Sequence, residues 1–189
     1  MVRNDWVEIP PEITEKHESL THYMDVMYVN GMPMLTGIDQ TIKFRAVIPL
    51  ESRQPEHFYN ALDKIFRIYN SAGFTLTRLE CDNEFRPIMD EVKDSLGITL
   101  NCPPADEKVG ASERNNRTIG ERIRATYHRL PYKAMPRIML KYMALVSVHQ
   151  LNIFPVKGGV SPYYSPHMIM KRQNFDFEKH CQVPFGAYV

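Results

Sequence analysis

Tyr23-Met24-Asp25-Val26-Met27-Tyr28-Val29 is the stretch of sequence that most restricts the fold. Apolar side chains occupy both alternating sets of positions, and Asp25 is its one charged residue. This pattern predicts a central β-strand that is buried on both faces. A carboxylate inside such a strand costs several kcal/mol unless it is paired or binds a cation. Asp25 therefore predicts either a cation site or an ion pair with a nearby Arg or Lys.

The sequence around this stretch predicts an α/β fold. Strands are expected at residues 22–30, 32–38, 42–50, 74–81 and 98–101, and helices at 55–70, 87–96, 111–130 and 136–153. The first three strands form an antiparallel meander, because Asn30-Gly31 is a strong tight-turn dipeptide. Strand and helix then alternate, which is typical of a mixed sheet flanked by helices.

The length of 189 residues leaves room for one ordinary domain. We expect an N-terminal arm at residues 1–20, the domain at 21–155 and a loop-rich C-terminal tail at 156–189. The tail is expected because Gly158-Gly159, Ser161-Pro162 and Ser165-Pro166 punctuate it. A composition of 43% hydrophobic and 24% charged residues fits a globular protein with a core.

The sequence favours an intracellular protein without a membrane segment. The N-terminus lacks the unbroken apolar stretch of a signal peptide, and the most apolar segment, residues 142–151, is too short to cross a bilayer. The three cysteines, Cys81, Cys102 and Cys181, form no CxxC motif, so we expect reduced, buried thiols and no zinc site.

Basic and acidic residues are concentrated in different parts of the chain, although the net charge is only +1. The segment from Glu113 to Lys141 holds eight basic and two acidic residues, a net charge of +6, and the remainder carries −5. A basic stretch of this kind is typical of a phosphate-binding face.

Two further carboxylates stand at element ends. Asp82 follows the fourth expected strand, where turn or capping chemistry is the alternative interpretation. Glu80 lies two residues earlier, on the same strand face, and is a rival ligand. Glu113 begins the basic helix.

One side of that helix is predicted to carry Glu113 followed by cations. Arg117, Arg124 and His128 share the side of Glu113, Arg114 adjoins it, and Ile119, Ile123 and Leu130 face the core. A solvated charged face is the alternative for this helix alone. Taken together, Asp25, Asp82 and Glu113 provide the hard oxygen ligands that two-metal phosphoryl transfer needs, with Mg²⁺ or Mn²⁺ as the two ions.

Several motifs resemble the integrase core of copia-type long-terminal-repeat retrotransposons, within the ribonuclease H-like superfamily. They run over most of the chain: Tyr23 to Asn30, Ile42-Lys43-Phe44, Cys81-Asp82-Asn83-Glu84-Phe85, Ser112-Glu113-Arg114-Asn115-Asn116-Arg117-Thr118-Ile119, Leu130 to Lys133, Leu151 to Pro155, Lys157 to Pro162 and Lys179 to Val189. The helix motif that contains Glu113 is the most specific of these.

The resemblance implies a ribonuclease H-like fold with a mixed five-stranded sheet flanked by helices. It implies that Asp25, Asp82 and Glu113 are the catalytic, metal-binding triad, and that Arg117 contacts DNA. The implied activity is DNA 3′-end processing followed by strand transfer. DNA ends and target DNA would be the partners of a homo-oligomer, located in the nucleus or in a cytoplasmic element particle.

Two departures from the family pattern keep other functions open. Glu84 stands where the family usually has Gly, and the 30 residues between Asp82 and Glu113 are fewer than is usual. The alternatives are a catalytically decayed nucleic-acid-binding relic of such an element, and a ribonuclease H-like nuclease whose only nucleophile is water.

Overall fold

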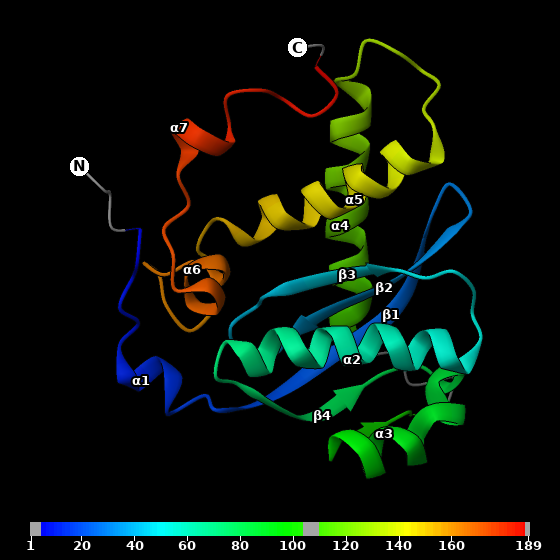
Figure 1. Cartoon of the computed structure of the whole chain (residues 1–189), viewed down its shortest axis with the longest axis vertical. Helices are drawn as coiled ribbons and strands as arrows, with labels where there is room; N and C mark the ends of the chain where they lie inside the picture. The colour runs from blue at the N-terminus through cyan, green and yellow to red at the C-terminus, as the bar shows by residue number, and fades with distance from the viewer. Residues whose placement is uncertain (1–4, 104–109, 188–189) are drawn as a thin grey trace.

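The computed structural model describes residues 5–103 and 110–187, which form a mixed sheet between two layers of helices (Figure 1). The strands are β1 (Ser19–Val29), β2 (Met32–Asp39), β3 (Arg45–Pro49), β4 (Thr75–Glu80) and β5 (Thr99–Asn101). Their spatial order is β3-β2-β1-β4-β5. The pairs β1–β2 and β2–β3 are antiparallel, whereas β1–β4 and β4–β5 are parallel. The predicted mixed five-stranded sheet is confirmed.

Each face of the sheet is covered by a helical layer. The helices are α2 (Pro55–Ser71), α3 (Met89–Leu96), α4 (Gly110–His128) and α5 (Arg137–Asn152), joined by the short helices α1 (Pro11–Thr14), α6 (Pro166–Lys171) and α7 (Phe177–His180). In Figure 1, α2 crosses in front of the sheet and α4 passes behind it. Two hydrophobic clusters result, one between the sheet and α2 and the other between the sheet, α4 and α5.

The central strand β1 is less buried than the sequence pattern predicted. On the α2 side Met24 is buried in the α2 cluster, but Tyr28, near the end of the strand, is 51% exposed. On the opposite side Asp25 and Met27 are partly buried. The expectation of a strand buried on both faces is therefore wrong at Asp25, Met27 and Tyr28.

The third strand begins at Arg45 and not at residue 42, because a buried carboxylate holds residues 41–44 in a turn. Asp39 accepts backbone hydrogen bonds from Thr41 at 2.9 Å, Lys43 at 3.1 Å and Phe44 at 2.8 Å, and another from Ile42. The Tyr69 hydroxyl donates to Asp39 at 3.1 Å. Burial raises the pKa of Asp39, and the four N–H groups act against that rise. The carboxylate thus satisfies donors that a strand would have paired.

Other elements also differ from those expected. A 3₁₀ helix, η1 (Asn83–Ile88), precedes α3, so helical structure begins four residues earlier than predicted. The expected loop-rich tail contains α6 and α7, and its Ile169 and Met170 join the main hydrophobic cluster. Trp6 forms an isolated bridge with Gln173, which connects the two terminal segments. The division into arm, domain and tail stays a prediction.

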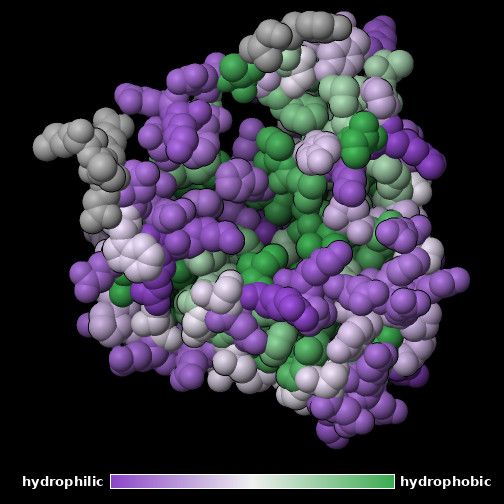
Figure 2. Space-filling model, viewed as in Figure 1, coloured by the Kyte–Doolittle hydropathy of each residue, from purple (hydrophilic) through white to green (hydrophobic). Residues whose placement is uncertain are grey.

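None of the described helices combines the length and the apolar character that crossing a bilayer requires. On the face drawn in Figure 2, hydrophilic residues surround most of the periphery and hydrophobic residues gather toward the middle.

His22 is a fully buried histidine on the α2 side of β1. Among the described residues, neither ring nitrogen has a hydrogen-bond partner, and its ring meets that of Tyr69 edge-on at 5.3 Å. Gly37 makes the space for it, because a Cβ at that position would lie 2.1 Å from His22 Nε2. Burial lowers the pKa of His22 from 6.5 to about 3.

This lowered pKa predicts acid sensitivity. Between pH 6.5 and about 3 the unfolded chain binds a proton that folded His22 does not. His22 should therefore make the free energy of unfolding fall on acidification, by about 1.4 kcal/mol for each pH unit in this window. Replacing His22→Leu should remove that slope in urea titrations at a series of pH values. Parallel pH profiles for the two proteins would show that His22 is not held neutral by burial.

Candidate active site

Asp25 lies in the middle of the sheet, on the side that α4 covers. Its Oδ1 accepts the N–H of Val26 at 2.7 Å, and its Oδ2 accepts Asn116 Nδ2 at 2.8 Å. The Thr36 hydroxyl, from the β2 residue opposite Asp25, lies 3.1 Å from the Asp25 carbonyl and also contacts Asn116 Oδ1. Within residues 5–103 and 110–187, no Arg or Lys forms an ion pair with Asp25. The ion-pair interpretation of Asp25 therefore does not hold for the described residues.

Asp82 follows β4 at the point where the parallel neighbour of β1 ends. Tyr23 of β1 pairs with Glu80 of β4, so the same register, continued by two residues, brings Asp82 beside Asp25 on the same face. The Asp82 side chain is exposed and makes no capping hydrogen bond to η1. Its backbone carbonyl accepts the N–H of Phe85 at 3.1 Å, so the turn is held by the main chain and the carboxylate is available for other contacts.

Glu113 lies in the first turn of α4 with an exposed side chain. Asn116, which reaches Asp25, follows three residues later, and residues at this spacing share one side of a helix. The buried Ser112 and Asn115 seat this turn against the sheet. The hydrogen bond from Asn116 therefore fixes the N-terminal end of α4 near Asp25.

The charges of these carboxylates act on one another. The pKa of Asp25 is raised from 3.8 to about 6, first by burial and then by the negative charges of Asp82, Glu84 and Glu113, while the hydrogen bond from the Val26 N–H acts against the rise. The three residues predicted from sequence thus lie within electrostatic reach at one place. As the side chains stand, no three His, Cys, Asp or Glu in the described segments are gathered closely enough to hold a metal ion.

Glu84 adds a fourth carboxylate that the sequence had marked only as a departure from the family pattern. It is half-buried in η1 and pairs with Arg53, whose Nε lies 3.0 Å from Glu84 Oε2 and whose Nη2 contacts the same oxygen. Tyr28 also interacts with Arg53. This contact links β1 to η1, the elements that carry or adjoin Asp25 and Asp82. No pattern in the sequence pairs residues 53 and 84.

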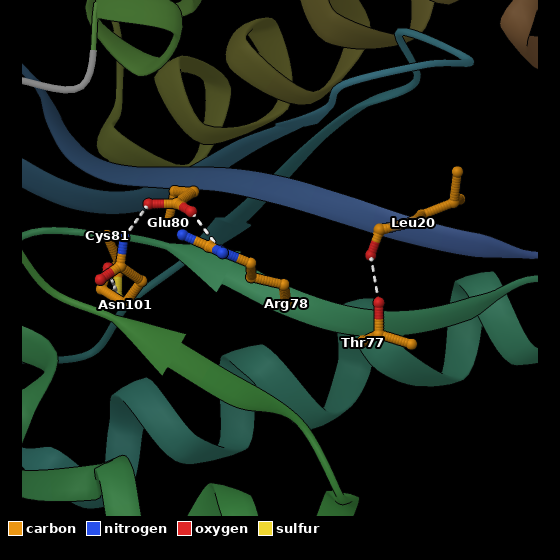
Figure 3. Close-up of polar contacts among 6 residues, drawn as sticks. All are labelled: Leu20, Thr77, Arg78, Glu80, Cys81 and Asn101. Carbon is orange, nitrogen blue, oxygen red and sulfur yellow. Dashed lines mark hydrogen bonds and ion pairs between the residues drawn. The ribbon is translucent and has the colours of Figure 1, made fainter.

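Glu80, the rival ligand, is already paired along the edge of the sheet (Figure 3). Its Oε1 accepts Arg78 Nε at 2.5 Å, and its Oε2 accepts Asn101 Nδ2 at 2.6 Å. Farther along β4, the Thr77 hydroxyl donates to the Leu20 carbonyl at 3.4 Å. Glu80 therefore joins β4 to β5, and a role as ligand would break both of its contacts.

The basic side chains of α4 are exposed to solvent, as their spacing predicted. Arg114, Arg117, Arg124 and His128 are exposed. Ile119 and Ile123 are buried against the sheet and α5, and Leu130 packs on the same cluster just beyond the helix. The exposed side of α4 thus offers cations in line with Glu113.

The cysteines differ in part from their expected state. All three are free, as predicted, but only Cys81 is buried; Cys102 is half-buried and Cys181 is exposed.

The sequence matches no family model and no curated protein. The structure is similar to the catalytic core domain of BIV integrase, with a TM-score of 0.60 and 16% sequence identity. The alignment covers 86% of this chain and 97% of that domain. At this identity the likeness concerns the fold and leaves the resemblance to copia-type elements a prediction. The chain has the ribonuclease H-like fold of an integrase catalytic core, with a mixed five-stranded sheet flanked by helices.

Proposed function

We propose that this chain is a retrotransposon-type integrase core that carries out DNA 3′-end processing and strand transfer. Asp25, Asp82 and Glu113 would hold two Mg²⁺ or Mn²⁺ ions. The observation that carries this proposal is the crowding of negative charge around Asp25, whose pKa is raised to about 6 by burial and by Asp82, Glu84 and Glu113. A cation relieves such repulsion, and carboxylate oxygens are the ligands that these two metals prefer.

The donor set fits the proposed ions. Asp25 is held in position by Val26 and Asn116, while Asp82 and Glu113 are exposed. Metal binding would require both of these side chains to rotate so that their oxygens approach Asp25. When bound, two such ions activate an attacking hydroxyl and stabilise the leaving oxygen of an in-line displacement. Asn116 would keep the Asp25 carboxylate oriented, because it ties that carboxylate to the helix of Glu113.

The exposed cations of α4 supply the second part of the proposal. Arg114, Arg117, Arg124 and His128 would contact DNA phosphates, which position a duplex without reading its sequence. Because they follow Glu113 along one side of the helix, DNA bound there would lead into the carboxylate site. Joining two DNA ends would further require a homo-oligomer, acting in the nucleus or in a cytoplasmic element particle.

The raised pKa of Asp25 can be measured directly in the metal-free protein. A ¹³C-detected carboxyl titration should give a midpoint near 6 for Asp25. Replacing Asp82→Asn should lower this midpoint, because it removes one of the negative charges nearby. Glu80→Gln is the matched control and should leave the midpoint in place, since Arg78 and Asn101 engage that side chain. An Asp25 midpoint near 4 in the parent protein would contradict the inference that burial and neighbouring negative charges raise the pKa of Asp25.

Strand joining tests the catalytic assignment. Given donor DNA with a free 3′-hydroxyl and Mg²⁺, Asp82→Asn should reduce joining by about a thousandfold or more, because it removes a ligand that stabilises the transition state. DNA binding and the Glu80→Gln control should be unaffected. Joining by Asp82→Asn at the parental rate would refute the triad. Cleavage without joining in the parent would identify a nuclease, and neither reaction in a folded, DNA-binding protein would identify a decayed relic.

DNA affinity tests the cationic face of α4. Arg117→Glu should weaken binding to all DNA sequences alike and lower the slope of log affinity against log salt concentration by about 1 or more. Arg67→Glu is the control, because Arg67 is also exposed but pairs with Asp63 on α2, across the sheet. Equal losses for both variants, or no loss for Arg117→Glu, would remove α4 from the DNA interface.

A further inference from the structure

Two cysteine side chains meet at the ends of β4 and β5. Glu80 and Asn101 are the last paired residues of the parallel strands β4 and β5. Cys81 directly follows Glu80, and Cys102 directly follows Asn101. Cys81 donates its N–H to the Asn101 carbonyl at 3.1 Å, so the main chains stay paired at this point. The two sulfur atoms lie 3.4 Å apart.

This geometry suits a covalent bond between the two sulfurs. Neighbouring strands run about 4.8 Å apart, and disulfides join residues whose Cα atoms are about 4.4–6.8 Å apart. The Sγ atoms must close from 3.4 Å to bonding distance, about 2.05 Å, which small rotations of both side chains provide.

The two thiols differ in their access to solvent. Cys81 is fully buried at the end of β4, whereas Cys102 is half-buried and so partly exposed to solvent. The third cysteine, Cys181, is exposed in the C-terminal segment. An oxidant that enters from solvent therefore meets Cys102 before it meets Cys81.

We propose that Cys81 and Cys102 form a modification site, a dithiol that small disulfide oxidants such as glutathione disulfide convert into an intramolecular disulfide. The Cys102 thiolate attacks one sulfur of glutathione disulfide, and a first glutathione leaves as its thiolate. Cys81 then attacks the Cys102 sulfur of the mixed disulfide and displaces the second glutathione. The protein loses two thiol protons and two electrons, and the oxidant becomes two glutathione thiols.

The bond has a structural consequence that is independent of the proposed function. It closes a loop that includes η1 and α3, and cross-linking such a loop stabilises a fold by restricting the unfolded chain. Cys81, the first residue of this loop, directly precedes Asp82. The disulfide would therefore hold the start of η1 next to the end of β5.

The test uses the full chain with Cys181→Ser, so that the pair is the only source of thiols. After equilibration with glutathione disulfide, intact-mass analysis should show the loss of two hydrogen atoms and no attached glutathione. Thiol titration of the unfolded product should find no free thiol, and the oxidised protein should melt several degrees higher until dithiothreitol reverses the change.

Two variants make the outcome decisive. In Cys102→Ser with Cys181→Ser, buried Cys81 alone should take up no glutathione while the protein stays folded. In Cys81→Ser with Cys181→Ser, Cys102 should carry one stable glutathione, because no second thiol displaces it. A stable glutathione adduct on Cys102 while Cys81 is present, or two free thiols under conditions that modify exposed Cys181 in the parent chain, would overturn the proposal.

Discussion

The arrangement of the site depends on one half-buried carboxylate in the middle of the sheet. Burying a charge is costly, and the cost is reduced when the charge accepts good hydrogen bonds. Asp25 receives one from its neighbour Val26 and one from Asn116 of α4. The second bond reaches across two layers of the fold, so the same interaction that stabilises Asp25 also fixes the helix that carries Glu113. A core leucine at position 25 would pack well but would not position α4.

Successive side chains of β1 point to opposite faces of the sheet, so the two faces have different surroundings. On one side, Met24 joins the hydrophobic cluster against α2, and the ring of fully buried His22 meets that of Tyr69 on α2. On the other side, Asp25 keeps partial access to solvent beneath α4. Rigid packing behind a partly open face is what a reactive group needs, because the position of the group is then set by the core and not by its own flexible surroundings.

The sequence could predict the strands, the helices and the three carboxylates because each depends on a local pattern. A nearly continuous apolar run marks β1, and helical spacing marks the buried side of α4, with Ile119 and Ile123 inward. The missed features depend on contacts between residues that are distant in sequence or on unusual local bonding. The ion pair of Arg53 with Glu84 joins the segment between β3 and α2 to η1, and the Asp39 turn replaces strand pairing with four hydrogen bonds to a single carboxylate. Asn116 could have been suspected, since it lies one turn from Glu113 on the same side.

The charge around Asp25 bears on the choice between an active core and a relic. Asp82 and Glu84 add negative charge where Asp25 is already disfavoured as an anion by burial. Arg53 neutralises Glu84 alone, because its bonds go to that carboxylate. In a relic without metal the remaining repulsion would only destabilise the fold, and neutral substitutions at positions 25, 82 or 113 would relieve it. All three acids are present, which supports the proposed divalent cations, because such ions would turn this repulsion into binding energy.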